Sequence, residues 1–324
     1  MKTPPGSPGA RIIRTAVDWS GAGLTLADYL TGRFTYRDRA AWCERIASGE
    51  ITLDGATVQP ETVLQLHQII EYHPGDLPEP PADLTCEVLH ADELTLVVVK
   101  SGNLCIHPAG PFFRHTLWHL LRSEYGEVHF LNRLDRETSG LVLAARTPEA
   151  AKRLAKRDQV REKVYQAIVH GDFPDALDAR GFLRPEGGII RKKRLFTFDR
   201  PENPPFESAA TKFRCLRRGG GFSLVRAELE TGRMHQIRAT LSALGFPVAG
   251  DKLYGPDDRL YLKQRNNELT AADREKLIFS RQALHAAELT YRDPATGETW
   301  HFTAPLPPEL AKFADQLERI PDHG

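Results

Sequence analysis

The sequence predicts an α+β protein whose main domain is a largely antiparallel mixed sheet with flanking helices, preceded by a small α/β unit. Strand-like runs occur in uneven groups, and helical stretches alternate with them irregularly, which argues against a repeating βαβ order. A proline-rich stretch at 74–83 separates these runs from a shorter N-terminal part. The length of 324 residues also favours about two domains, since one domain typically takes roughly 100–200 residues.

The N-terminal part is expected to hold a flexible tail at 1–20 and a small folded unit at 21–73. Two runs of apolar residues with helical spacing predict two short helices, around Leu26–Leu30 and Trp42–Ala47. A β-hairpin with an Asp-Gly turn is expected to follow at 51–58. These elements together predict a unit of two helices followed by a hairpin.

The main domain is expected at 84–320, after a stiff, extended linker at 74–83 that carries four prolines. A highly charged and helix-prone stretch at about 255–282 looks like an insertion into this domain. Strands are predicted at 87–89, 94–99, 141–144, 165–169, 212–216 and 223–229. Helices are predicted at 116–124, at 148–156, at 235–244 and from 307 to about 317.

Composition and apolar runs favour an ordinary globular protein of the cytoplasm. Hydrophobic residues make up 41% of the chain and charged residues 27%, without an extended biased tract. The apolar run Leu94–Val99 has strand length, far below the ~18 residues of a membrane span, and the N-terminus lacks a secretory pattern. Because the cysteines form no C-x-x-C pair, neither a zinc site nor a disulfide framework is expected.

The balance of charge gives a mixed indication about partners. With 43 basic and 43 acidic residues the chain is neutral, which argues mildly against a nucleic-acid partner. Positive charge is nevertheless concentrated at Lys152–Lys163, with six basic and two acidic residues, and at Arg191–Arg194. Such runs also occur on solvated faces of proteins that bind no nucleic acid, so both interpretations stay open at this point.

The segment Leu131-Asn132-Arg133-Leu134-Asp135-Arg136-Glu137-Thr138-Ser139-Gly140 carries the strongest chemical signal. Asp135 lies between two arginines, an environment that lowers a carboxyl pKa by about 1–3 units and keeps the group ionised as a nucleophile. A turn at Thr138-Ser139-Gly140 and a buried strand from Leu141 are expected to follow. In an arbitrary R-x-D-R sequence, however, such an aspartate is more often a surface ion pair or a turn residue.

This segment resembles the H-R-L-D-x-x-T-S-G signature of the RluA-type RNA pseudouridine synthases, with Asn132 where the family usually carries His. Further blocks are similar to the family's in the same order. They are 87–92 with Lys100-x-Gly102 and His107-Pro108, then Lys163-Val164-Tyr165-Gln166-Ala167, and Thr231-Gly232-Arg233-Met234-His235-Gln236-Ile237-Arg238. Gly250-Asp251, Leu253-Tyr254-Gly255, Leu284-His285-Ala286 and Pro305-Leu306-Pro307 complete the resemblance, and Ser101 stands where the family usually has Pro.

The resemblance implies a catalytic role for three residues. Asp135 is the expected nucleophile or base near C1′ and C6 of the target uridine. Arg238 is expected to hold its carboxylate through a bidentate, charge-assisted pair. Tyr165 is expected to lie against the uracil face, and its phenol is a candidate for removal of the C5 proton, although a phenol with a pKa near 10 is a poor base. Plain structural roles remain the alternative for Arg238 and Tyr165.

RNA recognition is expected to involve base flipping and basic side chains, because a stacked uridine cannot reach the carboxylate. The resemblance implies that Arg133 fills the gap left by the flipped base, with an ion pair as the alternative. The N-terminal unit resembles an S4 RNA-binding domain, with a generic helical hairpin as the alternative. RNA contacts are expected from Arg133, Arg136, Arg233, His235, Arg39, Arg191, Lys192 and Lys193. For His235 a purely structural role is an equal alternative.

The predicted function is therefore isomerisation of specific uridines in structured rRNA or tRNA, without a metal or small-molecule cofactor and without a membrane. A monomer is the default expectation. The alternative is an inactive S4-containing RNA-binding or RNA-chaperone protein, which has no chemical need for Asp135, Tyr165 and Arg238 together. A nucleoside glycosidase is a third reading, but no second acid stands near Asp135 at the required spacing.

Overall fold

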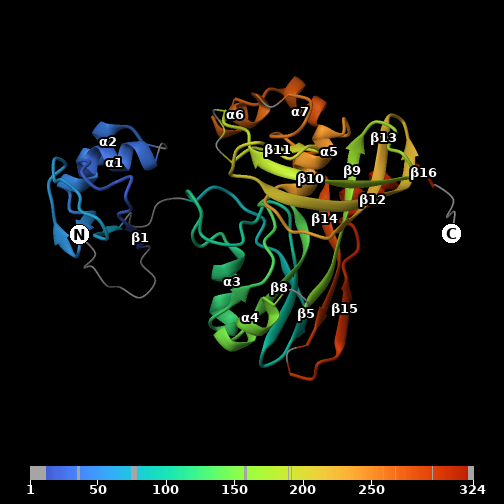
Figure 1. Ribbon diagram of the computed structural model, residues 1–324, viewed down its shortest axis with the longest axis horizontal. Helices are drawn as coiled ribbons and strands as arrows, with labels where there is room; N and C mark the ends of the chain where they lie inside the picture. Colours follow the sequence, from blue (N-terminus) through green and yellow to red (C-terminus); the bar gives the residue numbers. More distant parts are fainter. Residues whose placement is uncertain are drawn as a thin grey trace. The chain divides into compact units, whose positions relative to one another are not determined.

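The structure is a computed structural model that describes residues 12–34, 37–73, 79–156, 159–188, 190, 192–257, 259–266, 268–293 and 295–319. The chain divides into two compact units, 1–80 and 81–324, and each is described by itself (Figure 1). None of the described helices combines the length and the apolar character that a membrane-spanning helix requires.

The N-terminal unit packs two short helices against a small antiparallel sheet. Helices α1 (Leu26–Arg33) and α2 (Arg39–Ala47) begin at Thr25 and Asp38, whose side chains accept hydrogen bonds from amides of the first turn. The sheet has the order β1-β4-β2-β3. Its strands are β1 (Ile13–Ala16), β2 (Ile51–Leu53), β3 (Ala56–Thr57) and β4 (Ile69–Tyr72). Both predicted helices and the predicted hairpin are present.

The first strand corrects the prediction of a flexible tail at 1–20. Ile13–Ala16 pair with β4 over four residues, and Val17 is buried in the core of the unit. The prediction is wrong for these residues because the Pro- and Gly-rich composition ahead of them was extended too far. Residues 1–11 of that stretch, and 74–78 of the predicted linker, lie outside the described residues.

The larger unit is built on a 12-stranded sheet with the order β11-β10-β12-β13-β9-β14-β8-β6-β5 and three further strands at its sides. All pairs are antiparallel except β8 and β14. The strands in this order are β5 (Cys86–Ala91), β6 (Thr95–Lys100), β8 (Ser139–Ala145), β9 (Val160–His170), β10 (Ala176–Pro185), β11 (Arg194–Thr197), β12 (Glu207–Gly219), β13 (Phe222–Leu229) and β14 (Leu284–Arg292). Beside them lie β7 (His129–Phe130), β15 (Thr299–Thr303) and β16 (Glu318–Arg319).

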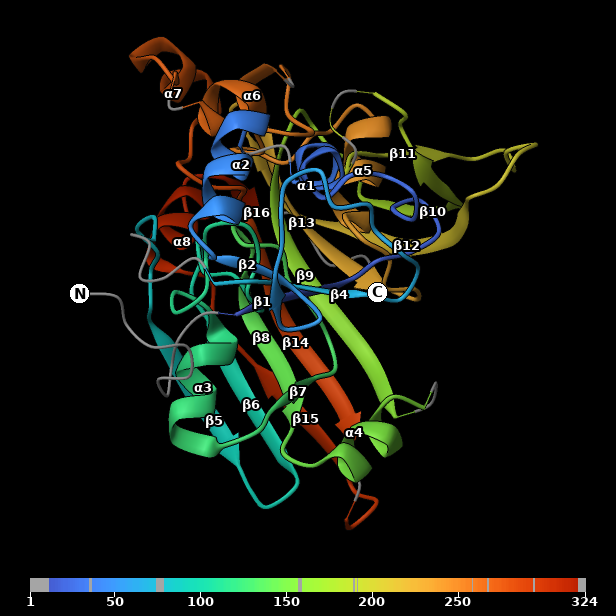
Figure 2. The same ribbon diagram turned by 90° about the vertical axis from the view of Figure 1, so that its left-hand side faces the viewer.

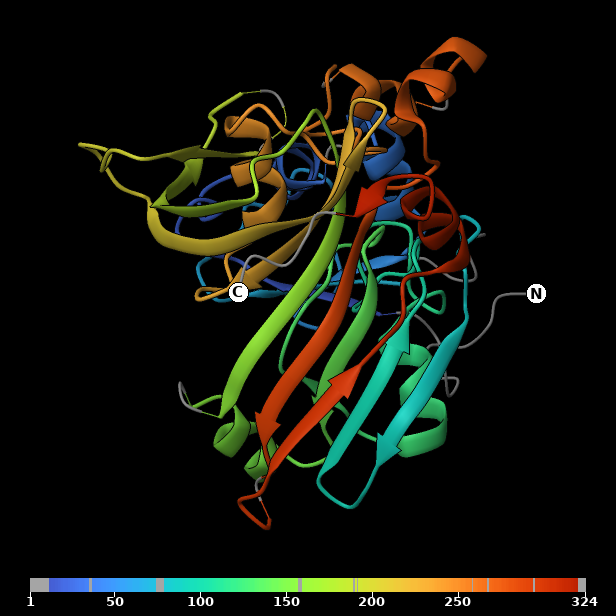
Figure 3. The ribbon, with the colours of Figure 1, turned by 90° about the vertical axis from the view of Figure 1, so that its right-hand side faces the viewer.

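Helices pack around both halves of this sheet, and the long strands β9 and β14 run through both halves (Figure 3). One half carries α3 (Leu117–Tyr125) and α4 (Pro148–Leu154), as Figure 2 shows. The other half carries α5 (Gln236–Ala243), which packs on β10 and β11. The remaining helices are α6 (Arg259–Arg265), α7 (Ala271–Leu277) and α8 (Pro308–Ala314). The predicted α+β class with a mostly antiparallel sheet is confirmed.

The position of β8 in the sheet explains why its sequence is a continuous apolar run. Alternate residues of a strand face opposite sides of the sheet. Val142 belongs to one hydrophobic core, together with residues of α3, whereas Leu141 and Leu143 belong to a second core with residues of α4. Because both faces of β8 are buried, every position from Ser139 to Ala145 is apolar or small.

Two glycines explain where local patterns misled the sequence-based prediction. Gly140 lies in β8 with φ +112°, and a Cβ there would fall 2.2 Å from the carbonyl oxygen of Ala286 on β14. The predicted turn at 138–140 is therefore the start of a strand that approaches its parallel neighbour closely. In β10, Gly181 allows Thr197 of β11 to approach, since a Cβ would lie 2.2 Å from its carbonyl oxygen. Glycine usually weakens a strand signal, so β10 was not predicted.

Candidate active site

The candidate site lies where the parallel strands β8 and β14 begin. Ser139 of β8 pairs with His285 of β14. Because parallel strands begin at the same edge of a sheet, the loop before β8 and the segment before β14 meet there. The loop carries Asp135 and the segment carries Gln282. Tyr165 of β9 pairs with Ala286, which brings a third segment to the same edge.

Asp135 contacts two side chains from distant parts of the chain. Its Oδ2 accepts a hydrogen bond from Arg238 Nη1 at 2.6 Å and a longer one from Gln282 Nε2 at 3.4 Å. Burial alone would raise the pKa of Asp135, but the charges of Arg238 and the proximity of His235 lower it to about 2. The carboxylate is therefore ionised at neutral pH, and 29% of its side-chain surface remains exposed.

Arg238 is shared between two carboxylates, which corrects the predicted geometry. It makes a single hydrogen bond to Asp135, whereas its bidentate pair is with Asp251, through Nε at 2.6 Å and Nη2 at 2.8 Å. Asp251 is fully buried and also accepts hydrogen bonds from the amides of Leu253 and Tyr254. The fork of the guanidinium is thus fixed by Asp251, and its remaining Nη1 is directed at Asp135.

Tyr165 is a buried residue that lines the same cavity as Asp135. Burial and the neighbouring charge of Asp135 raise the pKa of the phenol, so the hydroxyl stays protonated at neutral pH. This disfavours the phenolate that the removal of a C5 proton requires. The expectation that its ring provides a flat apolar surface is compatible with its position.

His235 has the buried position of a structural histidine, one of the two roles that the sequence left open. The other role, a contact to RNA phosphates, does not fit, because only 8% of its side chain is exposed. Its Nδ1 lies 2.9 Å from the Tyr254 hydroxyl and its Nε2 lies 3.7 Å from Asp135 Oδ1. The residue directly precedes α5 and has a left-handed backbone (φ 59°). A buried ring cannot serve as a surface phosphate contact.

Arg133 and Arg233 lie at the cavity, and Arg136 lies beside it on the same loop. The Arg133 side chain is exposed, as a residue that inserts into RNA requires. Arg233 is 40% exposed and contacts Glu207 and the carbonyl of Ser208. Arg136 contacts Glu137 and lies over the ring of Phe112. These two side chains are therefore already engaged within the protein.

The remaining predicted RNA contacts are distributed over both units. Lys192 lies 4.5 Å above the ring of Tyr261 in α6. Lys193 pairs with Glu186 at 3.0 Å and is only 13% exposed. Arg39 lies in α2 of the N-terminal unit. Arg191 lies outside the described residues.

Several residues of the site had no role in the sequence-based prediction. Asp251 stood in a noted Gly-Asp element, but its partner is 13 positions away and only the fold brings the two together. Gln282 donates to Thr138 and Asp135 from across the sheet. Lys252 is buried and pairs with Glu137 at 2.9 Å, which ties the loop after Asp135 to the segment following α5.

The loop before β8 is anchored by buried polar groups. Asn132, which replaces the usual His, donates to the carbonyl of Leu141 at 3.0 Å and accepts from the amide of Leu143 at 2.8 Å. It therefore pairs with the edge of β8 like a backbone group. Lys100 donates to the carbonyl of Arg136 at 3.1 Å and to that of Leu104 at 2.9 Å, and burial lowers its pKa to about 7.

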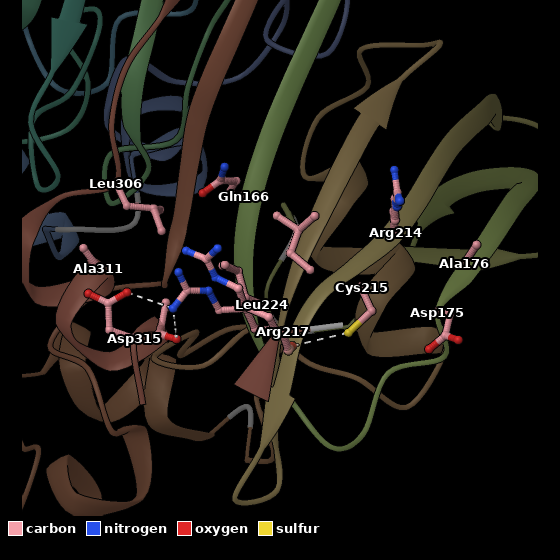
Figure 4. A pocket seen from close by; sticks show the side chains of 13 residues that line it. Gln166, Asp175, Ala176, Arg214, Cys215, Arg217, Leu224, Leu306, Ala311 and Asp315 are labelled. Carbon is pink, nitrogen blue, oxygen red and sulfur yellow. Dashed lines mark hydrogen bonds and ion pairs between the residues drawn. The ribbon is translucent and has the colours of Figure 1, made fainter. Parts of the chain in front are cut away.

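Two cavities lie on opposite faces of β9. The cavity at Asp135 measures about 60 Å³. A larger one of about 670 Å³ lies between the sheet, α8 and β16 and is lined by Gln166, Arg217 and Leu306 (Figure 4). Tyr165 and Gln166 are successive strand residues and therefore project to opposite faces, so the larger cavity contains none of the predicted site residues. Among the described residues no group of three or more His, Cys, Asp or Glu is placed to hold a metal ion.

Comparison with known proteins identifies the family. Residues 95–243 match the family described as RNA pseudouridylate synthase. The chain is 34% identical over 312 residues to an uncharacterized RNA pseudouridine synthase of Chloroflexus aurantiacus, which covers 90% of this chain and 89% of the relative. It is 30% identical over 326 residues to ribosomal large subunit pseudouridine synthase D of Vibrio vulnificus, which covers 96% and 97%.

A solved structure shows the same fold. Human RNA pseudouridylate synthase domain containing 1 superimposes with a TM-score of 0.57 and 24% identity, over 75% of this chain and 92% of that one. The likeness in fold and the extent of the sequence matches agree with each other. The chain belongs to the RNA pseudouridine synthase family.

Proposed function

We propose that Asp135 is the nucleophile with which this RNA pseudouridine synthase isomerises a uridine in structured RNA. The observation that carries the proposal is the single hydrogen bond from Arg238 to Asp135 Oδ2, made by a guanidinium that Asp251 already holds in place. A half-buried, ionised carboxylate at the wall of a cavity is suited to attack an electron-poor carbon. Its low pKa means that no proton has to leave before it reacts.

The chemistry assigns further tasks to the residues at this cavity. In the proposed reaction Asp135 attacks C1′ and breaks its bond to N1, which keeps the electron pair. After the uracil turns, C5 attacks C1′ and releases the carboxylate, and C5 then gives up its proton while N1 gains one. We infer that the Tyr165 ring supports the uracil while it turns, since its phenol stays protonated. The proton is more readily transferred to a carboxylate or to water than to a phenol whose pKa is raised.

Entry of the uridine is proposed to require base flipping. The cavity of about 60 Å³ is far smaller than the ~300 Å³ and more of a typical ligand pocket, so side chains at its rim have to move when a nucleotide enters. Arg133 is exposed and adjacent to the cavity. We propose that its planar guanidinium takes the place of the flipped base in the RNA stack.

The RNA is proposed to be ribosomal. The relative from Vibrio vulnificus is named as a synthase of the large ribosomal subunit and matches over nearly its whole length, whereas no comparable indication favours tRNA. We further propose that the N-terminal unit is an S4-like RNA-binding domain, on the basis of two capped helices followed by a hairpin. The stretch at 255–282 is proposed to act in position specificity. A monomer is the assumed state.

The test is pseudouridine formation on ribosomal RNA transcripts by the full chain and by Asp135→Asn. We expect the variant to lose activity by at least about 1,000-fold, because the neutral amide cannot attack. Its RNA affinity should stay within about three-fold, which is measured by filter binding. Asp175→Asn is the matched control, since it makes the same change in an exposed carboxylate paired with Arg218.

Three results would each contradict one part of the proposal. Full activity of Asp135→Asn would remove Asp135 as the nucleophile. Inactivity of the unaltered chain on every ribosomal and transfer RNA, with RNA binding intact, would favour the inactive RNA-binding alternative. Activity on tRNA alone would overturn the ribosomal assignment while leaving the catalytic proposal in place.

A further inference from the structure

His235 is enclosed by groups that specify which of its nitrogens carries a proton. The amide of Arg194 donates to the Tyr254 hydroxyl oxygen at 2.8 Å, and the same hydroxyl lies 2.9 Å from His235 Nδ1. The Arg194 amide can only donate, so the hydroxyl accepts on that side. Its own proton is then available for Nδ1, which becomes the acceptor.

The opposite side of the ring leads to the same conclusion. Nε2 faces Asp135 Oδ1 at 3.7 Å, and an unprotonated Nε2 would direct its lone pair at a carboxylate. A protonated Nε2 directs an N–H there instead. Burial lowers the pKa of His235 to about 4, so the ring carries one proton only at neutral pH. Both sides therefore favour the neutral form with hydrogen on Nε2.

This N–H complements the contact that Arg238 makes. Arg238 Nη1 holds Oδ2 of Asp135, and His235 faces Oδ1. At 3.7 Å the His235 contact is too long for a hydrogen bond, but such contacts in a site without substrate often shorten when the reacting complex forms. Two donors on the two oxygens fix the rotation of the carboxylate. A neutral donor does so without forming a second tight ion pair that would reduce nucleophilicity.

The hydrogen-bonded chain continues to a basic segment. Arg194 is the first residue of β11, and Lys192 and Lys193 precede it directly. Tyr254 is held from a second side as well, because the Arg238 guanidinium lies 5.0 Å from its ring centre. The Tyr254 hydroxyl is thus linked to the backbone of the basic segment through the Arg194 amide.

We propose that His235 is a positioning residue that orients Asp135 through Nε2–H, and that Tyr254 and the backbone amide of Arg194 keep it in that form. The proposal rests on the proposed function of Asp135, which it deepens. It also connects the basic segment 192–194 to the reacting carboxylate: RNA contacts that shift this segment would alter the donor facing Asp135.

The first experiment measures the tautomer directly. Two-bond 15N–1H correlation spectra of the full chain at pH 7.5 should show His235 protonated on Nε2 and unprotonated on Nδ1. Tyr254→Phe should mix the two forms, whereas Tyr291→Phe should not, because it removes a buried hydroxyl that contacts Thr95 instead. A proton on Nδ1 in the unaltered chain, or an unchanged His235 pattern in Tyr254→Phe, would overturn the proposal.

The second experiment separates positioning from support of the fold. Gln places its amide nitrogen near the position of Nε2, whereas Leu supplies no donor. We expect His235→Leu to lower kcat by about 10- to 100-fold with KM within about two-fold, and His235→Gln to recover most of the loss. Equal losses in both variants at matched thermal stability would show a structural role only.

The two experiments also distinguish this proposal from the assignment of Asp135. The tautomer spectrum needs no RNA and no activity. If the unaltered chain forms no pseudouridine, the proposed function fails even when the spectrum has the expected pattern. If the chain is active and the pattern is absent, the function of Asp135 stands and the role of His235 is wrong.

Discussion

Two arginine–aspartate pairs, one in each unit, show how differently the same chemistry acts on a surface and in a core. Arg39 and Asp28 of the N-terminal unit lie 3.1 Å apart with 51% and 54% of their side chains exposed. Arg238 and Asp251 lie 2.6 Å apart with 8% and 0% exposed. Water screens the first pair, whereas the second is isolated from it. Only the second can fix the direction of a third group.

The two units also differ in net charge. Residues 1–80 hold seven Lys and Arg against ten Asp and Glu, a net charge of −3, and the rest of the chain holds 36 against 33, a net of +3. In the N-terminal unit Arg14, Arg33, Arg39 and Arg45 each pair with a carboxylate of the same unit. Arginine content alone therefore overstates how strongly such a unit attracts phosphates.

The variant Asp251→Asn is the most severe test of the difference between the buried and the exposed arginine–aspartate pair. The change leaves the buried Arg238 without its bidentate partner, and we expect the free energy of unfolding to fall by about 3–5 kcal/mol. Activity should fall with it, because Nη1 is no longer held towards Asp135. Urea unfolding followed by circular dichroism measures the first effect. Asp28→Asn is the matched control, and equal stability loss in the two variants would contradict the comparison.

Acid should affect the buried site before it affects the surface pairs. Burial lowers the pKa of His235 and of His285 to about 4, below the ordinary value near 6.5. Below pH 6.5 the unfolded chain therefore binds protons that the folded chain does not, and stability falls as pH falls from about 6.5 towards 4. We expect unfolding to become easier by about 2 kcal/mol between pH 7.5 and 5.5.

Urea unfolding at the two pH values gives this difference. His285 contacts Ser139 and the carbonyl of Ala304, so His285→Gln removes one of the two contributions. The variant should lose about half as much stability on acidification. A variant with the same pH dependence as the unaltered chain would show that other groups determine the acid sensitivity.

The smallest expected effect concerns RNA affinity of the N-terminal unit. Asp28→Asn frees Arg39 from its carboxylate partner and removes one negative charge. We expect RNA binding to tighten about two-fold and the slope of log K against log salt to steepen by up to about 0.9, as for one added phosphate contact. Arg39→Gln should have the opposite effect. Unchanged slopes in both variants would show that α2 does not face the RNA.

Site residues that lie within a sequence motif were predictable. Those that only the folded chain brings to the site were not. Asp135 stood out because its neighbours form a long, specific signature, and its partner Arg238 stood in a second one. The bidentate pair was assigned to the wrong carboxylate because sequence does not rank two acids that the fold brings to one guanidinium. Helix periodicity reveals neither the left-handed backbone of His235 nor the burial of its ring. Gln282 reaches the site only through the parallel pairing of two strands.

That parallel pairing has a consequence for how the protein folds. It joins Ser139 to His285, which are 146 positions apart, so a very long loop closes before the pair contributes stability. The strands β5 and β6, in contrast, are joined by three residues, and β8, which pairs with β6, follows it after 38 residues. During synthesis Asp135 therefore emerges and enters its local sheet well before Gln282 exists. The enzyme is expected to gain activity only after the last third of the chain has left the ribosome, which prevents a partly made copy from modifying RNA.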